Sequence, residues 1–128
     1  MTYKRKYYNV KTRALDGAVF DSYKEARRWD ELLLLQRAGK ITDLQRQVRY
    51  ELIPAQYQTY ERYGKKGQRL KDGVRLLEKS VCYVADFVYT IAETGENIVE
   101  DSKGVRTKDY IIKRKLMLAV HGIRIKET

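Results

Sequence analysis

The sequence predicts a single mixed α/β domain, and three observations support this prediction. The chain has 128 residues, which is the size of one compact domain. Apolar residues make up 43% of it and charged residues 34%, so the chain carries enough apolar surface to form a core. Some segments place apolar residues at the spacing of a helix, and others alternate apolar and polar residues as strands do.

The best-marked element is a helix that we predict over residues 22–38. Ser22 is a favourable N-cap and Gly39 a favourable residue just beyond the C-terminal end. Glu25 fits a capping box with Ser22, but helical geometry also turns it to within about 40° of Trp29, on the face that the helix buries. A buried carboxylate without a partner is costly. Capping and a role in a functional site are therefore both open for Glu25.

Two strands are predicted in the middle of the chain. Residues 44–53 alternate in the manner of a strand and stop at Pro54. Residues 81–91 are apolar on both sides, which predicts a central strand. In this strand, strict alternation puts Cys82, Val84, Asp86 and Val88 on one side, and Tyr83, Ala85, Phe87 and Tyr89 on the other.

Shorter elements complete the pattern. Asp16-Gly17 predicts a small hairpin at residues 15–20, and the segment IVEDSKG, residues 98–104, predicts a strand that follows a turn. Thr107 is a plausible N-cap for a helix over 108–120, and GIRIKE at 122–127 predicts a last strand.

The acids in the two central strands suggest a metal site. Asp101 and Lys103 point the same way, with Cα atoms about 6.5 to 7 Å apart, and a hairpin register would bring Asp86 beside Asp101. Two adjacent carboxylates repel each other, and a divalent cation such as Mg²⁺ is the simplest way to keep both ionised. An ammonium beside them could act on an attacking water or a phosphate. A polar residue satisfied by ordinary hydrogen bonds is the alternative for Asp86.

The net charge of +10 favours a polyanionic partner, with nucleic acid as the leading candidate. We predict a basic, tyrosine-rich arm over residues 1–13, a basic loop or hairpin inserted at about 57–75, and a basic face on the helix at 108–120. A frayed terminus and solvated surface charges are the alternatives. The candidate DNA-binding residues are Lys65, Lys66, Arg69, Lys71, Lys108, Lys113 and Arg114.

Other chemistries are excluded by composition. The single cysteine, Cys82, and the single histidine, His121, are too few for an internal disulfide or a zinc site made of such ligands. No apolar run approaches the roughly 18 residues that span a bilayer, and the N-terminus lacks the apolar region of a secretory signal. We therefore expect a cytoplasmic protein without membrane partners.

The ordered segments FDSYKEARRWDELLLLQRAGKITDLQRQ, YVADFVY and VEDSKGVRTKDYIIKRKLM resemble a family of small phage and prophage proteins in the PD-(D/E)XK, or restriction-endonuclease-like, superfamily. The resemblance covers about residues 13–126. Its relatives include Holliday-junction resolvases and the endonucleases that nick transposon ends. Ala85 stands before Asp86 where the superfamily commonly has proline, a departure that leaves the metal role intact.

The resemblance implies a nuclease-like domain over residues 14–128 with an αβββαβ core, in which helices flank a central mixed sheet. It implies Mg²⁺- or Mn²⁺-dependent hydrolysis of DNA, with Glu25, Asp86 and Asp101 around the metal and Lys103 at the water. Glu100 competes with Asp101 as ligand, although the spacing to Lys103 favours Asp101.

The function expected from this resemblance is that of an endodeoxyribonuclease for branched or structured DNA, such as a Holliday-junction resolvase that acts as a homodimer in the bacterial host cell of a phage or prophage. A non-catalytic DNA-binding module and a nicking subunit of a larger recombination complex are the alternatives.

Overall fold

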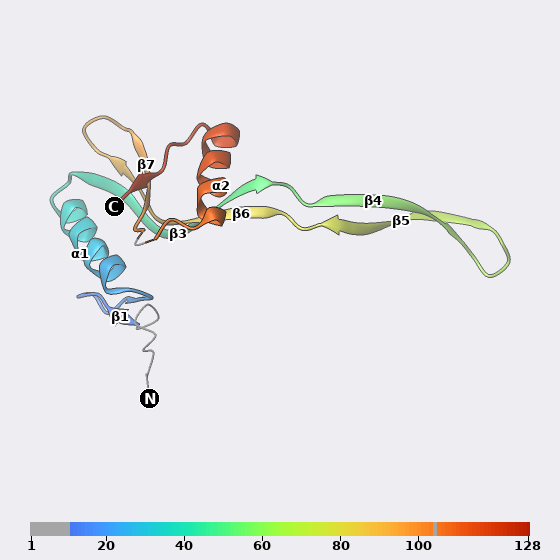
Figure 1. Ribbon diagram of the computed structural model, residues 1–128, viewed down its shortest axis with the longest axis horizontal. Helices are drawn as coiled ribbons and strands as arrows, with labels where there is room; N and C mark the ends of the chain where they lie inside the picture. The colour runs from blue at the N-terminus through green and yellow to red at the C-terminus, as the bar shows by residue number, and fades with distance from the viewer. Residues whose placement is uncertain (1–10, 104) are drawn as a thin grey trace.

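A four-stranded mixed sheet forms the centre of the structure (Figure 1). The computed structural model describes residues 11–103 and 105–128. The strands lie in the order β3 (Ile41–Ile53), β6 (Val81–Ile91), β7 (Asn97–Asp101) and β8 (Lys126–Glu127). β6 is antiparallel to both of its neighbours, whereas β7 and β8 are parallel. The predicted mixed α/β class and the central position of residues 81–91 are confirmed.

Two helices accompany the sheet, α1 (Tyr23–Arg37) and α2 (Lys108–Leu116), and α2 continues into the π-helical turn η2 (Met117–His121). Ser22 Oγ accepts a hydrogen bond from the Glu25 backbone N–H at 3.1 Å, and Thr107 caps α2 in the same way. Both predicted N-caps are therefore confirmed, and within the described ranges no hydrogen bond joins the Glu25 carboxylate to the Ser22 backbone. None of the helices in the described ranges is long and apolar enough to cross a membrane.

Two apolar clusters hold the helices to opposite faces of the sheet. Consecutive residues of β7 point to different faces, so Val99 joins the α2 cluster while Glu100 reaches α1. The buried members of the α1 cluster are Ala14, Phe20, Ala26, Leu32, Ile41, Phe87 and Tyr89. Those of the α2 cluster are Leu52, Tyr83, Ala85, Val99, Tyr110, Met117 and Ile125.

The strict alternation predicted for β6 is wrong, because the buried side chains before Asp86 and those after it point to opposite faces of the sheet. The buried residues before Asp86, Tyr83 and Ala85, belong to the α2 cluster, and those after it, Phe87 and Tyr89, belong to the α1 cluster. The paired strand gives the physical reason. Gln47 lies opposite Asp86, between two regular pairs, and its φ of 55° is left-handed, which interrupts the pleat.

A long antiparallel hairpin, β4 (Gln56–Tyr63) and β5 (Arg69–Glu78), extends away from the sheet (Figure 1). It occupies the position of the basic loop or hairpin expected at about 57–75. The Tyr60 ring covers Gly73 so closely that a Cβ at this glycine would lie 2.2 Å from the ring. Arg75 also contacts the ring, 4.5 Å from its centroid. We call this segment the hairpin arm.

The predicted small hairpin at the start of the chain is present. β1 (Thr12–Arg13) pairs with β2 (Val19–Phe20), and Gly17 takes the left-handed φ of 90° that the turn requires. Residues 1–10, the larger part of the expected basic arm, lie outside the described residues.

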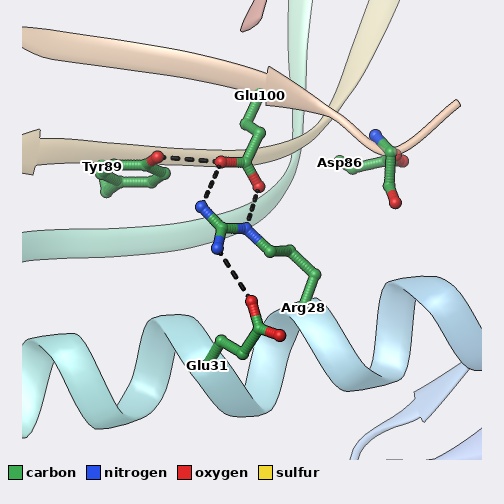
Figure 2. A network of polar contacts seen from close by, with 6 residues as sticks. Arg28, Glu31, Asp86, Tyr89 and Glu100 are labelled. Atoms are coloured by element: carbon green, nitrogen blue, oxygen red, sulfur yellow. Dashed lines mark hydrogen bonds and ion pairs between the residues drawn. The ribbon is translucent and has the colours of Figure 1, made fainter. Parts of the chain in front are cut away.

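A buried ion pair fixes α1 to β7. The Arg28 guanidinium reaches from the helix to Glu100, donating from Nε and Nη2 at 2.7 and 2.8 Å, and it also contacts Glu31 at 3.0 Å (Figure 2). Tyr89 completes the network by donating its hydroxyl to Glu100 at 2.8 Å. Glu100 is 0% exposed, so these donors supply what water would otherwise provide.

We expect Arg28→Met to lower the free energy of unfolding by about 3 to 5 kcal/mol, because it leaves the Glu100 carboxylate buried without its cation. Adding Glu100→Gln should recover part of this loss, since the neutral amide costs less to bury. Arg37→Met, an exposed change on the same helix, is the control and should stay within about 0.5 kcal/mol of wild type in urea denaturation. Equal losses for Arg28→Met and the control would contradict this account.

Candidate active site

The structure brings Asp86 and Asp101 together at neighbouring positions of β6 and β7. The register pairs Phe87 with Glu100, so the adjacent pair is Asp86 and Asp101. The Ser102 backbone N–H donates to Asp86 Oδ2 at 2.8 Å, which ties the end of β7 to this carboxylate. Both acids therefore lie at the point where β7 ends.

Asp101 is the most deeply placed of these groups, with 1% of its surface exposed. Tyr83 donates its hydroxyl to Asp101 Oδ2 at 2.5 Å, and Lys103 Nζ lies 3.2 Å from Oδ1. The lysine contact brings the charges together without hydrogen-bond geometry, and among the described residues Oδ1 has no hydrogen-bond donor. The Lys103 ammonium also lies 4.6 Å from the centroid of the Tyr110 ring.

Burial raises the pKa of Asp86 to about 7, and the negative charge of Asp101 adds to this effect. The hydrogen bond from Ser102 acts in the opposite direction, and Glu25 raises the pKa further. A carboxylate whose pKa is raised this far by burial and by a second carboxylate is typical of a functional site.

Glu25 is half-buried, and its pKa is raised by burial and by the charges of Asp21 and Asp101, whereas Lys103 lowers it. The charges of Glu25 and Asp101 therefore act on each other, and the charge of Glu25 also raises the pKa of Asp86. The half-buried position of Glu25 on α1 agrees with the helix face predicted from the sequence.

The residues present fit a hard divalent cation. Asp86 and Asp101 are adjacent carboxylates, and Asp101 Oδ1 lacks a hydrogen-bond donor within the described residues. No group of three or more His, Cys, Asp or Glu side chains in those ranges is gathered so that it could hold a metal by itself. Mg²⁺ is commonly bound by one or two carboxylates, with waters and substrate phosphate completing the shell, so two carboxylates meet its requirement.

Glu100 and Asp101 are separated by the alternation of β7. Glu100 faces α1, where Arg28 and Tyr89 occupy its carboxylate, and Asp86 lies apart from those contacts (Figure 2). Asp101 faces the α2 side with Lys103 beside it. The geometry therefore favours Asp101 over Glu100 as partner of Asp86.

The basic residues singled out from the sequence occupy different environments. Lys65 and Lys66 are exposed at the tip of the hairpin arm, where Arg69 instead pairs with Asp72 at 2.7 Å. Arg114 pairs with Glu127 at 3.1 Å. Two more, Lys71 on the arm and Lys108 at the start of α2, are exposed, and Lys113 lines a cavity that also contains Lys103.

Three residues that contact the site or position its elements were not anticipated from the sequence: Tyr83 and Ser102, which contact the aspartates, and Arg28, which joins α1 to β7. Ser102 acts through its backbone N–H, which carries no sequence signal, and Tyr83 meets Asp101 only across the sheet. The position of Arg28, three residues after Glu25 and thus on the same helix side, is the one signal that could have indicated its role.

The family model described as "Protein of unknown function (DUF1064)" matches residues 4–126. The chain belongs to the DUF1064 family. No curated protein and no solved structure gave a significant match.

We expect Asp86→Asn to stabilise the metal-free protein at neutral pH. The folded pKa of about 7 exceeds the unfolded value of about 3.9, so the stability associated with protonated Asp86 is present below pH 4 and lost as the pH rises through 7. Because solvent screens part of this effect, the variant should gain about 1 to 3 kcal/mol over wild type above pH 7.

The measurement is urea denaturation in EDTA from pH 4 to 8, with Glu93→Gln in the exposed β6–β7 turn as the control. The difference between Asp86→Asn and wild type should grow with pH, whereas the control should show no such trend. A variant less stable than wild type at pH 8 would rule out repulsion between the aspartates.

Proposed function

We propose that this DUF1064 protein is a metal-dependent endodeoxyribonuclease that hydrolyses phosphodiesters in branched DNA, as a phage or prophage Holliday-junction resolvase in the cytoplasm of the host cell. The observation that carries the proposal is the juxtaposition of Asp86, Asp101 and Lys103 at the end of β7. The order of elements also supports it. Apart from the hairpin arm and β1–β2, the chain runs α1, β3, β6, β7, α2, β8, the αβββαβ order of the restriction-endonuclease-like core.

In this proposal Asp86 and Asp101 would hold Mg²⁺ or Mn²⁺, and Glu25, whose charge raises the pKa of Asp86, would assist from α1. The ion, when bound, would polarise the scissile phosphate and lower the pKa of a water. Tyr83 and the Ser102 N–H keep the two carboxylates oriented. The Lys103 ammonium would stabilise the negative charge that develops on the phosphate or orient the attacking water.

Phosphate contacts would come from the exposed basic residues of the hairpin arm and of α2. Lys65 and Lys66 stand at the arm tip, and the exposed Tyr57 and Tyr63 on the same arm offer rings for base stacking. Two symmetric cuts need two sites, so the proposal includes a homodimer.

We expect the protein to cut a four-way DNA junction in preference to linear duplex when Mg²⁺ or Mn²⁺ is supplied. Asp86→Asn and Lys103→Ala should each lower the cleavage rate at least about 100-fold while junction binding is kept, because they remove a metal ligand and a stabilising charge. Gel analysis of cleavage and fluorescence anisotropy of binding are the two measurements. Mg²⁺ should also raise the Tm of wild type but not that of Asp86→Asn.

Glu93→Gln is the control and should cleave like wild type. Tight junction binding with no cleavage under either metal would overturn the nuclease and support a non-catalytic DNA-binding module. Cleavage that is restored by a partner protein would instead support a nicking subunit.

The arm tip makes a separate prediction. Lys65→Ala/Lys66→Ala should weaken junction binding and flatten the plot of log K against log salt by about 2, since each lost phosphate contact removes about 0.9 from the slope. The charge-matched control, Arg37→Ala/Lys40→Ala near the end of α1, should keep the wild-type slope. Equal slopes for both double variants would remove the arm tip from the DNA interface.

A further inference from the structure

A second cavity of about 460 Å³ lies beside the candidate active site, on the α1 side of the sheet. Its basic lining comes from Lys24 and Arg27 on α1 and from Lys126 on β8. Arg28 and Glu31 also line it, but they pair with each other. The other three cations, Lys24, Arg27 and Lys126, form no ion pair within the described part of the chain. The cavity therefore carries an excess of positive charge.

Two hydroxyl groups add to this lining. Ser102 Oγ and Thr128 Oγ1 are buried and have no hydrogen-bond partner among the described residues. A buried hydroxyl without a partner costs free energy, which a ligand that accepts hydrogen bonds would recover. Cations together with free hydroxyl donors are the groups that bind phosphate oxygens.

The cavity and the acidic site share one short segment of the chain. Asp101 and Lys103 contact each other on one side of it, and the intervening Ser102 lines the cavity on the other. Lys24 links the two sites directly, because its Nζ donates to the Lys103 carbonyl oxygen at 3.1 Å. A DNA strand with its scissile phosphate at Asp101 would thus have a neighbouring nucleotide close to the cavity.

We propose that this cavity binds one nucleotide of the DNA strand next to the scissile phosphate, with the phosphate on Lys24, Arg27 and Lys126 and the base on the Tyr23 ring. The inference rests on the proposed function and assigns a site for an unpaired or displaced nucleotide. Its volume lies in the range of small-molecule sites and exceeds what a bare phosphate fills. Tyr23 lines the cavity and is 66% exposed, which leaves its ring available for stacking.

The test uses thymidine 3′,5′-bisphosphate and the full chain in EDTA, with binding measured by isothermal titration calorimetry. Arg27→Ala/Lys126→Ala should weaken binding at least tenfold, since each change removes a charge-assisted contact worth about 1.5 kcal/mol or more. Tyr23→Ala should weaken binding of the bisphosphate but leave the weaker binding of inorganic phosphate unchanged. Arg37→Ala/Lys40→Ala, with the same loss of charge outside the cavity, should bind like wild type.

Arg27 and Lys126, the two residues changed in the double variant, are both exposed, and thermal melting checks that the variants fold. If the double variant fails to fold, the single change Arg27→Gln replaces it, with Arg37→Gln as its control. Equal weakening by cavity and control variants, or no weakening by either, would overturn the inference. The binding measurement involves no metal and no cleavage. If the protein cuts junctions but the cavity variants bind the bisphosphate like wild type, only the inference about the cavity is refuted. A protein that binds the nucleotide through the cavity residues but cuts nothing would refute the nuclease alone.

Discussion

The contact on which the rest of the site depends is the buried ion pair between Arg28 and Glu100. A carboxylate with no exposed surface needs hydrogen-bond donors from the protein, because water does not reach it. Arg28 and Tyr89 donate three hydrogen bonds to Glu100. This requirement fixes α1 at one distance and rotation relative to β7. Glu25 lies one turn before Arg28, and Asp101 follows Glu100 directly. The same contact that stabilises the helix therefore also sets how Glu25 stands relative to the aspartates.

Alternation along residues 100–103, at the end of β7, puts the carboxylate pair and the basic cavity on opposite sides of the chain. Glu100 and Ser102 face α1, whereas Asp101 faces α2, where Tyr83 and Lys103 contact it. A carboxylate pair and a basic cavity can lie next to each other because the strand backbone stands between them. In the proposed function this arrangement would hold a metal on one side of the strand and a neighbouring nucleotide on the other. Burial, together with the neighbouring charge of Asp101, raises the pKa of Asp86, so the ionised form of this carboxylate costs the fold stability.

Much of the fold could be predicted because its signals are local. Ser22 and Thr107 cap the two helices at the predicted positions, and the strand over residues 81–91 has the predicted bounds. The facing of that strand could not be predicted, because Gln47 on the paired strand adopts a left-handed φ that disturbs it. The second helix ends before residue 120 because its last turn has the π-helical hydrogen bonding of η2. No cap residue in the sequence indicates such a change.

The order of amino acids is enough to identify the kinds of groups available: acids inside apolar strands, a lysine two residues after one of them, and an excess of positive charge. It identifies these because period, capping and charge are properties of neighbouring residues. Which acid lies beside which partner depends on the folded chain. Folding placed Asp101 beside Asp86, turned Glu100 to Arg28, and brought Lys126 to the cations of α1. Those choices follow from strand register and from helix packing across the sheet, which join residues as far apart as 24 and 126.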